Sequence, residues 1–557
     1  MTKTFERFRI LALGLVAVVC LLAIAQPSFS SRAVHGAAGY QGVYDVKTFG
    51  AIGDGKKLDT PAINKTIDAA AAAGGGTVYF PAGNYLSVSI HLKSNIALYL
   101  DQGATIIAAS TSNDIKYDPP EPNEWDKYQD FGHSHWHNSL IWGENLTNVS
   151  ILGPGMIWGK GLVRSGSQSR TRQQNDALNA ARANEPKQPF GYPNPRDAVE
   201  PGWANKSIAL KLCRNVIIRD ITIFHGGHFA ILATGVDNLT IDNLKIDTNR
   251  DGIDIDACKN VRVSNCTVNS PFDDGICPKS SFALGYAHAT ENVTITNCQV
   301  SGYDEGTLLD GTFKREFRNQ NGTFSPTGRI KFGTESNGGF KNITITNCVF
   351  DYCRGLALES VDGGLLEDVT ISNITMRDIA NCPIFLRLGS RMRGPAGAPV
   401  GALRRVTLSN IIAYNVEPRY ASIISGVPGL DIEDLTLNNI RIYYKGGGTK
   451  QQAALDPQEK ENDYPEPSMF GEIPAYGFFI RHVRGLEMNG VSVSYLKDDA
   501  RAPFIISNTK GVDLNHVKID HAPGVPSFIL KDVEDFSIQL SHPLEDVRLK
   551  KAIRRDL

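Results

Sequence analysis

The sequence lacks the features that mark several protein classes. Its 57 Lys and Arg residues nearly balance 59 Asp and Glu residues, which gives a formal net charge of −2. This balance provides no global attraction to nucleic acid, so we expect no nucleic-acid partner. No CxxC pair occurs among the nine cysteines, which argues against the commonest zinc motifs. No long apolar run follows residue 25, so we expect that the chain after this residue does not associate with a membrane.

The first residues have the pattern of a secretory signal. Lys3, Arg7 and Arg9 precede an uninterrupted apolar run over residues 10–25, and small residues that suit cleavage follow. A run of this length is short for a membrane span. We predict a signal peptide over residues 1–30 and a mature chain that is secreted or periplasmic.

Eight cysteines remain in the mature chain, and three of them share one sequence context. Cys266, Cys298 and Cys348 end the phrases "VSNC", "ITNC" and "ITNC". An exported protein can oxidise its cysteines. The shared context nevertheless predicts side chains that stack as buried structural thiols, free or partly paired.

A short repeat sets the expected architecture. Copies read "NVIIRDITI" at 215, "NLTIDNLKI" at 238, "NVRVSNCTV" at 260 and "NVTITNCQV" at 292, and weaker copies continue to 511. Alternation at period two, rich in Val, Ile and Thr, indicates strands with one buried face. A period of about 22 residues without helices between the strands indicates a parallel β-helix. We predict an all-β, single-stranded right-handed parallel β-helix that forms one domain over residues 31–557.

The ends and corners of this solenoid carry their own signals. Thr60-Pro61 and the following "AINKTIDAAAAAGGG" predict an N-capped helix that covers the first coil, within a cap region of about 40–110. The repeated asparagines are expected at coil corners, where Asn tolerates a left-handed backbone. Residues 111–138, 159–206 and 444–475 read as loops, and loops on one side of a solenoid are expected to line a cleft.

Acidic residues cluster where two successive repeats end. "TNRDGIDID" supplies Asp251, and "SPFDDGICPKSS" supplies Asp273 and Asp274. Asp251 and Asp273 are separated by one repeat, so we expect them on adjacent coils about 5 Å apart. Crowded carboxylates raise one another's pKa, and cleavage of a glycosidic bond needs one protonated and one ionised carboxyl. A calcium site is the competing interpretation. Asp254 and Asp256 alternate along the next strand, and we interpret them as structural.

These residues resemble those of glycoside hydrolase family 28, the polygalacturonase family. The resemblance starts at "VKTFGAIGDGKKLDTPAINKTIDAAAAAGGGTVYFPAGNYL" and extends to about residue 380. "DGIDIDACKNVRVSNC", "DDGICPKSS" and "GTESNGGFKNITITNC" carry its more specific part. It implies the pectin lyase-like solenoid, inverting hydrolysis without a metal or other cofactor, and a pectic polysaccharide or oligosaccharide as substrate. By resemblance, Asp274 is the general acid, and Asp251 with Asp273 positions the attacking water.

The sequence departs from the family at three motifs. Arg250 stands between Asn249 and Asp251, where the family has Asn-Thr-Asp. The Gly-His-Gly motif has no match: one alignment places Thr327 there, and another places Asp304 or Glu305. The Arg-Ile-Lys motif, which grips a galacturonate carboxylate in the family, falls on "GLALES", so its basic positions hold the residues Ala357 and Glu359.

Other side chains are candidates for binding the substrate. Lys279 follows the aspartate pair and is the best remaining anion anchor, and Arg354 is a second. His228, or His225 beside it, precedes Asp251 by one coil and could replace the missing histidine. Glu335 in "GTESNGG" completes the set.

Three alternating histidines raise the question of a metal. His133, His135 and His137 would share one face of a strand and could bind zinc or copper. No acidic or Cys partner follows at ligand spacing, so we expect a loop beside the sugar cleft, with Trp136 as a stacking ring, and no metal.

We therefore predict a secreted, monomeric glycoside hydrolase that cleaves galacturonate or rhamnogalacturonan linkages with Asp251, Asp273 and Asp274. Two alternatives stay open. One is calcium-dependent β-elimination of the pectate-lyase type, in which the three aspartates bind Ca²⁺. The other is a non-catalytic, glycan-binding β-helix.

Overall fold

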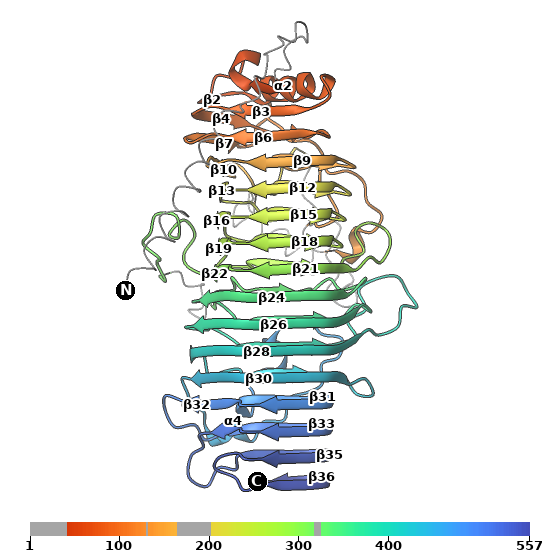
Figure 1. Cartoon of the computed structure of the whole chain (residues 1–557), viewed down its shortest axis with the longest axis vertical. Helices are drawn as coiled ribbons and strands as arrows, with labels where there is room; N and C mark the ends of the chain where they lie inside the picture. Colours follow the sequence, from red (N-terminus) through yellow and green to blue (C-terminus); the bar gives the residue numbers. More distant parts are fainter. Residues whose placement is uncertain (1–41, 130–131, 164–201, 317–324) are drawn as a thin grey trace, which may run out of the picture. The chain divides into compact units, whose positions relative to one another are not determined.

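Nearly all strands pair in parallel with a strand one coil away. A computed structural model of the chain describes residues 42–129, 132–163, 202–316 and 325–557. Within Val43–Leu557, which form one compact unit, the strands stack along a single long axis (Figure 1). This is the right-handed parallel β-helix predicted from the repeat. The predicted signal peptide, residues 1–30, and the boundary at residue 31 lie outside the described residues. Among the described residues, no helix is long and apolar enough to span a bilayer.

Each early coil contributes up to three strands, so the strands form three rows. The first row contains β5 Ile90–His91, β8 Ile141–Glu144, β11 Lys206–Lys211, β14 Phe229–Thr234, β17 Asp251–Asp256 and β20 Ile276–Lys279, and β23 Lys331–Phe332, β25 Leu356–Ser360, β27 Ile384–Leu388 and β29 Ser422–Ser425 follow along it. The second row contains β1 Val43–Asp45, β3 Gly76–Phe80, β6 Ile96–Leu100, β9 Thr147–Leu152, β12 Arg214–Arg219, β15 Asp237–Asp242, β18 Lys259–Ser264 and β21 Thr290–Thr296. The third row contains β2 Asp54–Leu58, β4 Gly83–Ser87, β7 Ala104–Ala108, β10 Met156–Trp158, β13 Thr222–Phe224, β16 Lys245–Asp247, β19 Thr267–Asn269 and β22 Gln299–Ser301.

Later coils merge neighbouring rows into long strands. β24 Phe340–Asp351, β26 Leu365–Arg377, β28 Ala402–Val416 and β30 Ile432–Tyr444 join the second and third rows; β31 Ala475–Asn489, β33 Ala502–Asn515 and β35 Phe528–Gln539 join the first and second; β32 Ser492–Tyr495 and β34 Lys518–Ile519 continue the third. Besides helix α2 Thr60–Ala72, the described segments contain the helical elements η1 Val46–Phe49, η2 Asp126–Tyr128, α4 Lys450–Ala453 and η5 Pro467–Phe470.

The repeat explains both the core and the corners. In β18, for example, Val261 and Val263 point inward while their neighbours face outward. Asparagines that open successive copies form a ladder: Asn148, Asn215, Asn238, Asn260, Asn292 and Asn342. Each later side-chain amide donates to the preceding asparagine at 2.8–3.3 Å. Their φ angles lie between 53° and 58°, so the predicted left-handed corners are confirmed.

Both ends of the stack are covered. Helix α2, Thr60–Ala72, lies over the first coil and buries Ile63 and Ile67 (Figure 1). The N-cap is Asp59 rather than the predicted Thr60, because the Thr60 hydroxyl accepts a hydrogen bond from the Val88 amide instead. At the other end, β36 Val547–Asp556 pairs antiparallel with β35. Parallel stacking therefore ends at a strand that runs in the opposite direction, and both sheet edges are protected.

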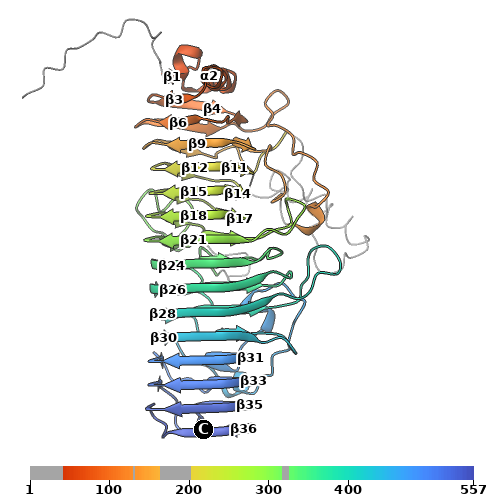
Figure 2. The same ribbon diagram turned by 45° about the vertical axis from the view of Figure 1, so that its right-hand side comes forward.

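The long connections gather beside the first row of strands. Figure 2 shows them on the side of the stack that carries β11, β14 and β17. In the described part of 111–138 the only regular element is η2, and between the end of β30 and the start of β31 the regular elements are α4 and η5. These two segments are loops, as predicted; most of the third predicted loop, residues 159–206, lies outside the described residues. The eight cysteines from Cys213 to Cys382 are buried free thiols, so the structural interpretation of the stacked cysteines is confirmed.

Candidate active site

The three candidate aspartates meet at the start of the first-row strands. Asp251 is the first residue of β17, and Asp273 and Asp274 lie in the turn before β20. The ladder pairs Ile253 with Ile276, so Asp251 is in register with Asp274, not with the predicted Asp273. The preceding turn is one residue longer than its counterpart on the coil before, and this insertion shifts the register. Carboxylate oxygens of Asp251 and Asp273 still lie within 4.8 Å, so the predicted meeting of these side chains on adjacent coils is confirmed.

Asp251 lies in a crowded acidic environment. Its side chain is buried, and the Asp274 amide donates to its Oδ1 at 3.3 Å. Lys279 Nζ is 3.9 Å from Oδ2. Burial raises the pKa of Asp251 well above its usual range, and the charges of Asp254 and Asp273 add to the effect more than Lys279 opposes it. The structure therefore favours the protonated form of Asp251.

Asp274 lies in a basic environment although it is equally buried. Arg329 Nε donates to its Oδ1 at 2.9 Å, and Lys331 Nζ is 3.2 Å from Oδ2. Burial alone would raise the pKa of Asp274, but Lys331 and Arg329 outweigh it and hold that pKa well below its usual range. The ionised form is favoured, which conflicts with the role of general acid that the resemblance gives to Asp274.

Asp273 is the most open of the three aspartates. A quarter of its side chain is exposed, whereas the side chains of Asp251 and Asp274 are 4% and 3% exposed. Arg250 forms an ion pair with Asp273 at 2.7 Å. The residue that interrupts the family's Asn-Thr-Asp pattern therefore holds one of the candidate carboxylates.

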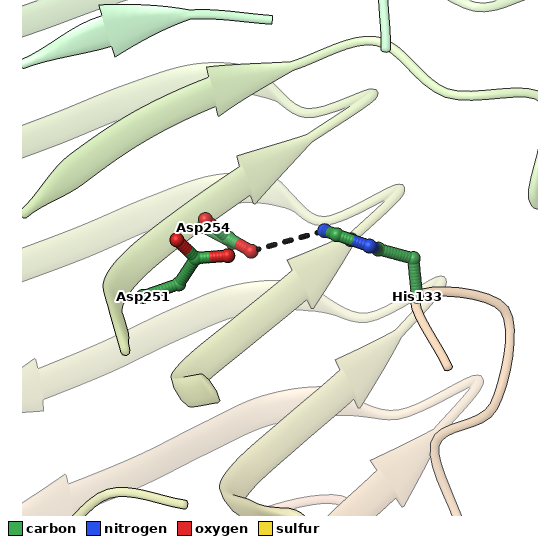
Figure 3. A group of neighbouring side chains, drawn as sticks. All are labelled: His133, Asp251 and Asp254. Atoms are coloured by element: carbon green, nitrogen blue, oxygen red, sulfur yellow. Dashed lines mark ion pairs between the residues drawn. The ribbon is translucent and has the colours of Figure 1, made fainter. Parts of the chain in front are cut away.

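His133 reaches the site from the loop at 111–138. Its Nε2 lies 3.3 Å from Asp254 Oδ2, beside Asp251 (Figure 3). Burial and the nearby Lys279 lower the pKa of His133, but Glu335 and Asp254 outweigh them and raise it. Asp254, which the sequence analysis interpreted as structural, is fully buried in this cluster. Sequence spacing could not reveal the pair, because its two members lie about 120 residues apart.

The three histidines do not share a face. His135 Nε2 lies 2.6 Å from Asp126, and His137 Nε2 lies 2.9 Å from Glu144, so each histidine faces a different acid. Trp136 is fully buried and its Nε1 donates to Thr234, so the expectation of an exposed stacking ring is wrong. The segment turns instead of forming a strand, and alternate residues therefore point in different directions.

The other predicted binding residues lie in the same region but are buried. Lys279 Nζ is 3.5 Å from Glu335, and Glu335 also pairs with Arg393. His228 is buried, and its ring nitrogen lies within 4.8 Å of oxygens of Asp251 and Asp273. Lys279, Glu335 and His228 therefore surround the aspartates instead of opening toward solvent.

A basic pair that the sequence analysis missed lies one coil before the expected position. Arg329 and Lys331 belong to the phrase "GRIKFG", whose letters repeat the family's Arg-Ile-Lys motif. Lys331 is in register with Ala357 on the next coil. Ala357 is one of the two positions to which the sequence analysis assigned the basic residues of the Arg-Ile-Lys motif. The other position holds Glu359, 3.8 Å from Lys331 Nζ, and burial raises its pKa to about 8 although Lys331 and Arg329 oppose this.

The loop at 444–475 covers this basic pair. Glu466 forms ion pairs with Arg329 and, at 3.0 Å, with Arg354. The ring centroid of Tyr464 lies 5.7 Å from Lys331 Nζ. The predicted contribution of this loop to the cleft is therefore confirmed, and Arg354 contacts it directly.

The alignment candidates for the family histidine, Thr327, Asp304 and Glu305, have other contacts. Glu305 pairs with His225 at 2.6 Å, and Asp304 accepts a hydrogen bond from the Glu316 amide. Thr327 lines an open groove beside Asp273, and Arg354 lines the same groove. His133 and His228 both reach the aspartates: each offers a ring nitrogen within 4.8 Å of a carboxylate oxygen of Asp251.

Among the residues that the structure describes, two sets of side chains could hold a metal ion. The ligand atoms of His133, Asp251 and Asp254 lie within 4.8 Å of one another, and so do those of His228, Asp251 and Asp273. Imidazole and carboxylate donors suit a divalent cation such as zinc. Lys279 already brings a positive charge to Asp251, which reduces the need for a metal. The expected absence of a metal stays a prediction.

Comparisons with known proteins agree with this architecture. The family model described as rhamnogalacturonase A/epimerase, pectate lyase-like, matches residues 43–187, and a right-handed β-helix region model matches residues 202–314. A probable polygalacturonase of Vitis vinifera is 22% identical over 473 residues, 79% of this chain and 83% of that protein. A mannuronan C5-epimerase of Azotobacter vinelandii is 69% identical over 72 residues, which is 13% of this chain and 7% of the epimerase.

Two solved structures share the fold. The family 28 exopolygalacturonase of Yersinia enterocolitica has a TM-score of 0.60 at 21% identity, covering 86% of this chain and 79% of that one. An exopolygalacturonase of Thermotoga maritima has a TM-score of 0.52 at 17% identity, covering 92% and 95%. This chain has the fold of these two solved structures, and its resemblance to the polygalacturonase family is confirmed.

Proposed function

We propose that this protein is a secreted glycoside hydrolase that cleaves galacturonate-containing pectic polysaccharide, acting as a monomer without a metal. The observation that carries the proposal is the pair of aspartates on adjacent coils, Asp251 and Asp274, whose surroundings favour opposite protonation states. Hydrolysis of a glycosidic bond needs such a pair, one carboxyl to protonate the leaving oxygen and one to activate water. The similarity to a probable polygalacturonase supports the choice of substrate.

The division of roles follows from the charges around each carboxyl. Asp251 is the proton donor, because burial and its acidic neighbours keep the proton on it. Asp274 is the base that activates water, because Arg329 and Lys331 keep it ionised. Asp273, the most exposed of the three, helps to position the water or the sugar. This assignment exchanges the roles that the family resemblance gives to Asp251 and Asp274, and it keeps the same three residues.

The test is the release of reducing ends from defined galacturonate and rhamnogalacturonan oligosaccharides. We expect saturated products of inverted anomeric configuration from the wild-type protein. Asp251→Asn and Asp274→Asn should each abolish turnover. Absence of reducing-end release from every pectic substrate would contradict the proposal and favour a non-catalytic glycan-binding role.

A second candidate function rests on the two donor clusters around Asp251. Carboxylates that bind Ca²⁺ could support β-elimination of the pectate-lyase type. That reaction leaves unsaturated products that absorb in the near ultraviolet, and a chelator would stop it. Product absorbance therefore separates the two candidates in a single assay.

A further inference from the structure

An open groove leads away from the aspartates along the turns that precede the first-row strands. It has a volume of about 920 Å³ and begins at Phe272, next to Asp273. Its other lining residues include Thr327, Arg354, Tyr420 and Lys445. The groove therefore follows the coil axis toward the C-terminal coils.

Backbone hydrogen bonds join the turns that form the floor of this groove. Gly328 N donates to Asp273 O, and Arg354 N donates to Thr327 O, both at 2.8 Å. Ala380 N then donates to Cys353 O at 2.9 Å, and Glu417 N to Ile379 O at 2.8 Å. Arg419 thus lies four coils beyond Asp273, which at the usual strand spacing is about 19 Å along the axis.

The cations nearest to the aspartates are paired with carboxylates of the protein, and Arg250, which is 26% exposed, pairs with Asp273 at 2.7 Å. The side chains of Lys279, Arg329 and Lys331 are 6%, 2% and 4% exposed, and each pairs with a carboxylate of the protein. The Arg-Ile-Lys letters stand at Arg329 and Lys331, and both of these cations are already held by Asp274. A sugar carboxylate would have to displace a carboxylate of the protein to pair with any of these cations.

Within the groove, most cations are also paired. Arg315 contacts Asp351 and Asp378, Lys445 contacts Glu417 at 2.8 Å, and Arg354 contacts Glu466. Arg419 differs from them: it is exposed, and its guanidinium carbon lies 5.7 Å from the ring centroid of Tyr420. No carboxylate in the described part of the chain forms an ion pair with it.

We propose that this groove binds an acidic segment of the polysaccharide at a distance from the bond that is cleaved, with Arg419 pairing with a uronate carboxylate. The planar guanidinium presents two parallel N–H donors that match the two oxygens of a carboxylate. The inference rests on the proposed function and names the substrate feature that the site recognises. A substrate must extend from Asp273 to Arg419, so short oligosaccharides do not gain this contact.

The test compares acidic oligosaccharides of increasing length. Arg419→Gln should raise KM about tenfold for oligogalacturonides long enough to span the groove, and leave kcat unchanged. KM for the shortest cleaved oligogalacturonide should stay at the wild-type value. Arg419→Lys should restore part of the affinity, because it keeps the charge and loses the two-pronged geometry. The matched control is Arg554→Gln, an exposed arginine on β36, which should behave as wild type.

The outcomes separate this inference from the proposed function. An equal KM for Arg419→Gln and wild type on long oligogalacturonides that are still cleaved would overturn the inference alone. If no pectic substrate is cleaved, the proposed function fails, and calorimetric titration with acidic and neutral oligosaccharides tests the groove directly. Equal affinity of wild type and Arg419→Gln for the acidic oligosaccharide in that titration would overturn the inference as well.

Discussion

Asp251 and Asp274 stand at matching register positions on adjacent coils, and the nearest charges around them differ in sign. Asp251 faces Asp254 and Asp273, with Lys279 at 3.9 Å. Asp274 faces Arg329 at 2.9 Å and Lys331 at 3.2 Å. Both side chains are buried, so burial raises both pKa values and cannot distinguish them. The comparison shows that stacking places the acids together, while neighbours from other coils decide which one holds the proton.

The largest expected effect is that of Asp274→Asn. The substitution leaves the buried cations Arg329 and Lys331 without their shared anion, so we expect the free energy of unfolding to fall by about 3 kcal/mol. Turnover should also be lost, because the carboxylate that we propose activates water is replaced by a neutral amide. Chemical denaturation and a reducing-sugar assay measure the two effects.

The pH dependence of this loss is part of the prediction. A carboxyl with a depressed pKa in the folded protein stabilises it above the ordinary Asp pKa of about 3.9, and that stability disappears as pH falls through the depressed pKa. Wild type and Asp274→Asn should therefore converge in stability only in strong acid. Asp273→Asn is the control, since its more exposed carboxylate should change stability little. Equal stabilities of Asp274→Asn and wild type at neutral pH would contradict the basic environment assigned to Asp274.

Asp251→Asn should affect activity as strongly as Asp274→Asn but should not destabilise the fold. Loss of a general acid costs roughly 10²–10⁴-fold in rate. Because the pKa of Asp251 is raised in the folded protein, the free energy of unfolding falls as pH rises from the ordinary pKa of Asp to the raised value. The neutral amide that replaces the carboxyl does not ionise, so the variant avoids this loss. We expect the variant to match or exceed wild type in stability at neutral pH. A clearly less stable variant would show that the ionised form of Asp251 is the native one.

A smaller effect is expected from His133→Gln. The raised pKa of His133 means that the protonated ring stabilises the fold below its ordinary pKa of about 6.5, and that this contribution disappears as pH rises through the raised value. The variant should therefore lose more stability at pH 6 than at pH 9, by about 1 kcal/mol. His137→Gln, in the same segment, is the control. The same loss at both pH values would indicate that His133 contributes by packing alone.

The smallest effect is expected from removal of metal ions. Because Lys279 already supplies a positive charge beside Asp251, treatment with EDTA should leave both turnover and thermal stability unchanged. Assays before and after dialysis against the chelator, with Ca²⁺ and Zn²⁺ added back, check this. If EDTA abolished activity and an added metal ion restored it, the acidic cluster around Asp251 would be a metal site.

Part of the candidate site could be predicted from the sequence because it repeats with the coils. Asp251 and the Asp273-Asp274 pair follow successive copies of the repeat, so their convergence follows from the repeat length. Their register could not be predicted, because one additional residue in a turn moves Asp274 opposite Asp251. The charges around Asp274 could not be predicted either, since Arg329 and Lys331 lie in the long interval between the repeat copies at 292 and 342.

The sequence by itself determined the solenoid. Inward Val and Ile at period two, and asparagines such as Asn238 and Asn260 that accept a left-handed backbone, are local preferences that each coil repeats. Only the tertiary structure decided the chemistry of the cleft. His133, Lys331 and Glu466 reach it from segments far apart in the chain. Coulomb energies depend on distances in space and on burial, and neither can be read from separation along the sequence.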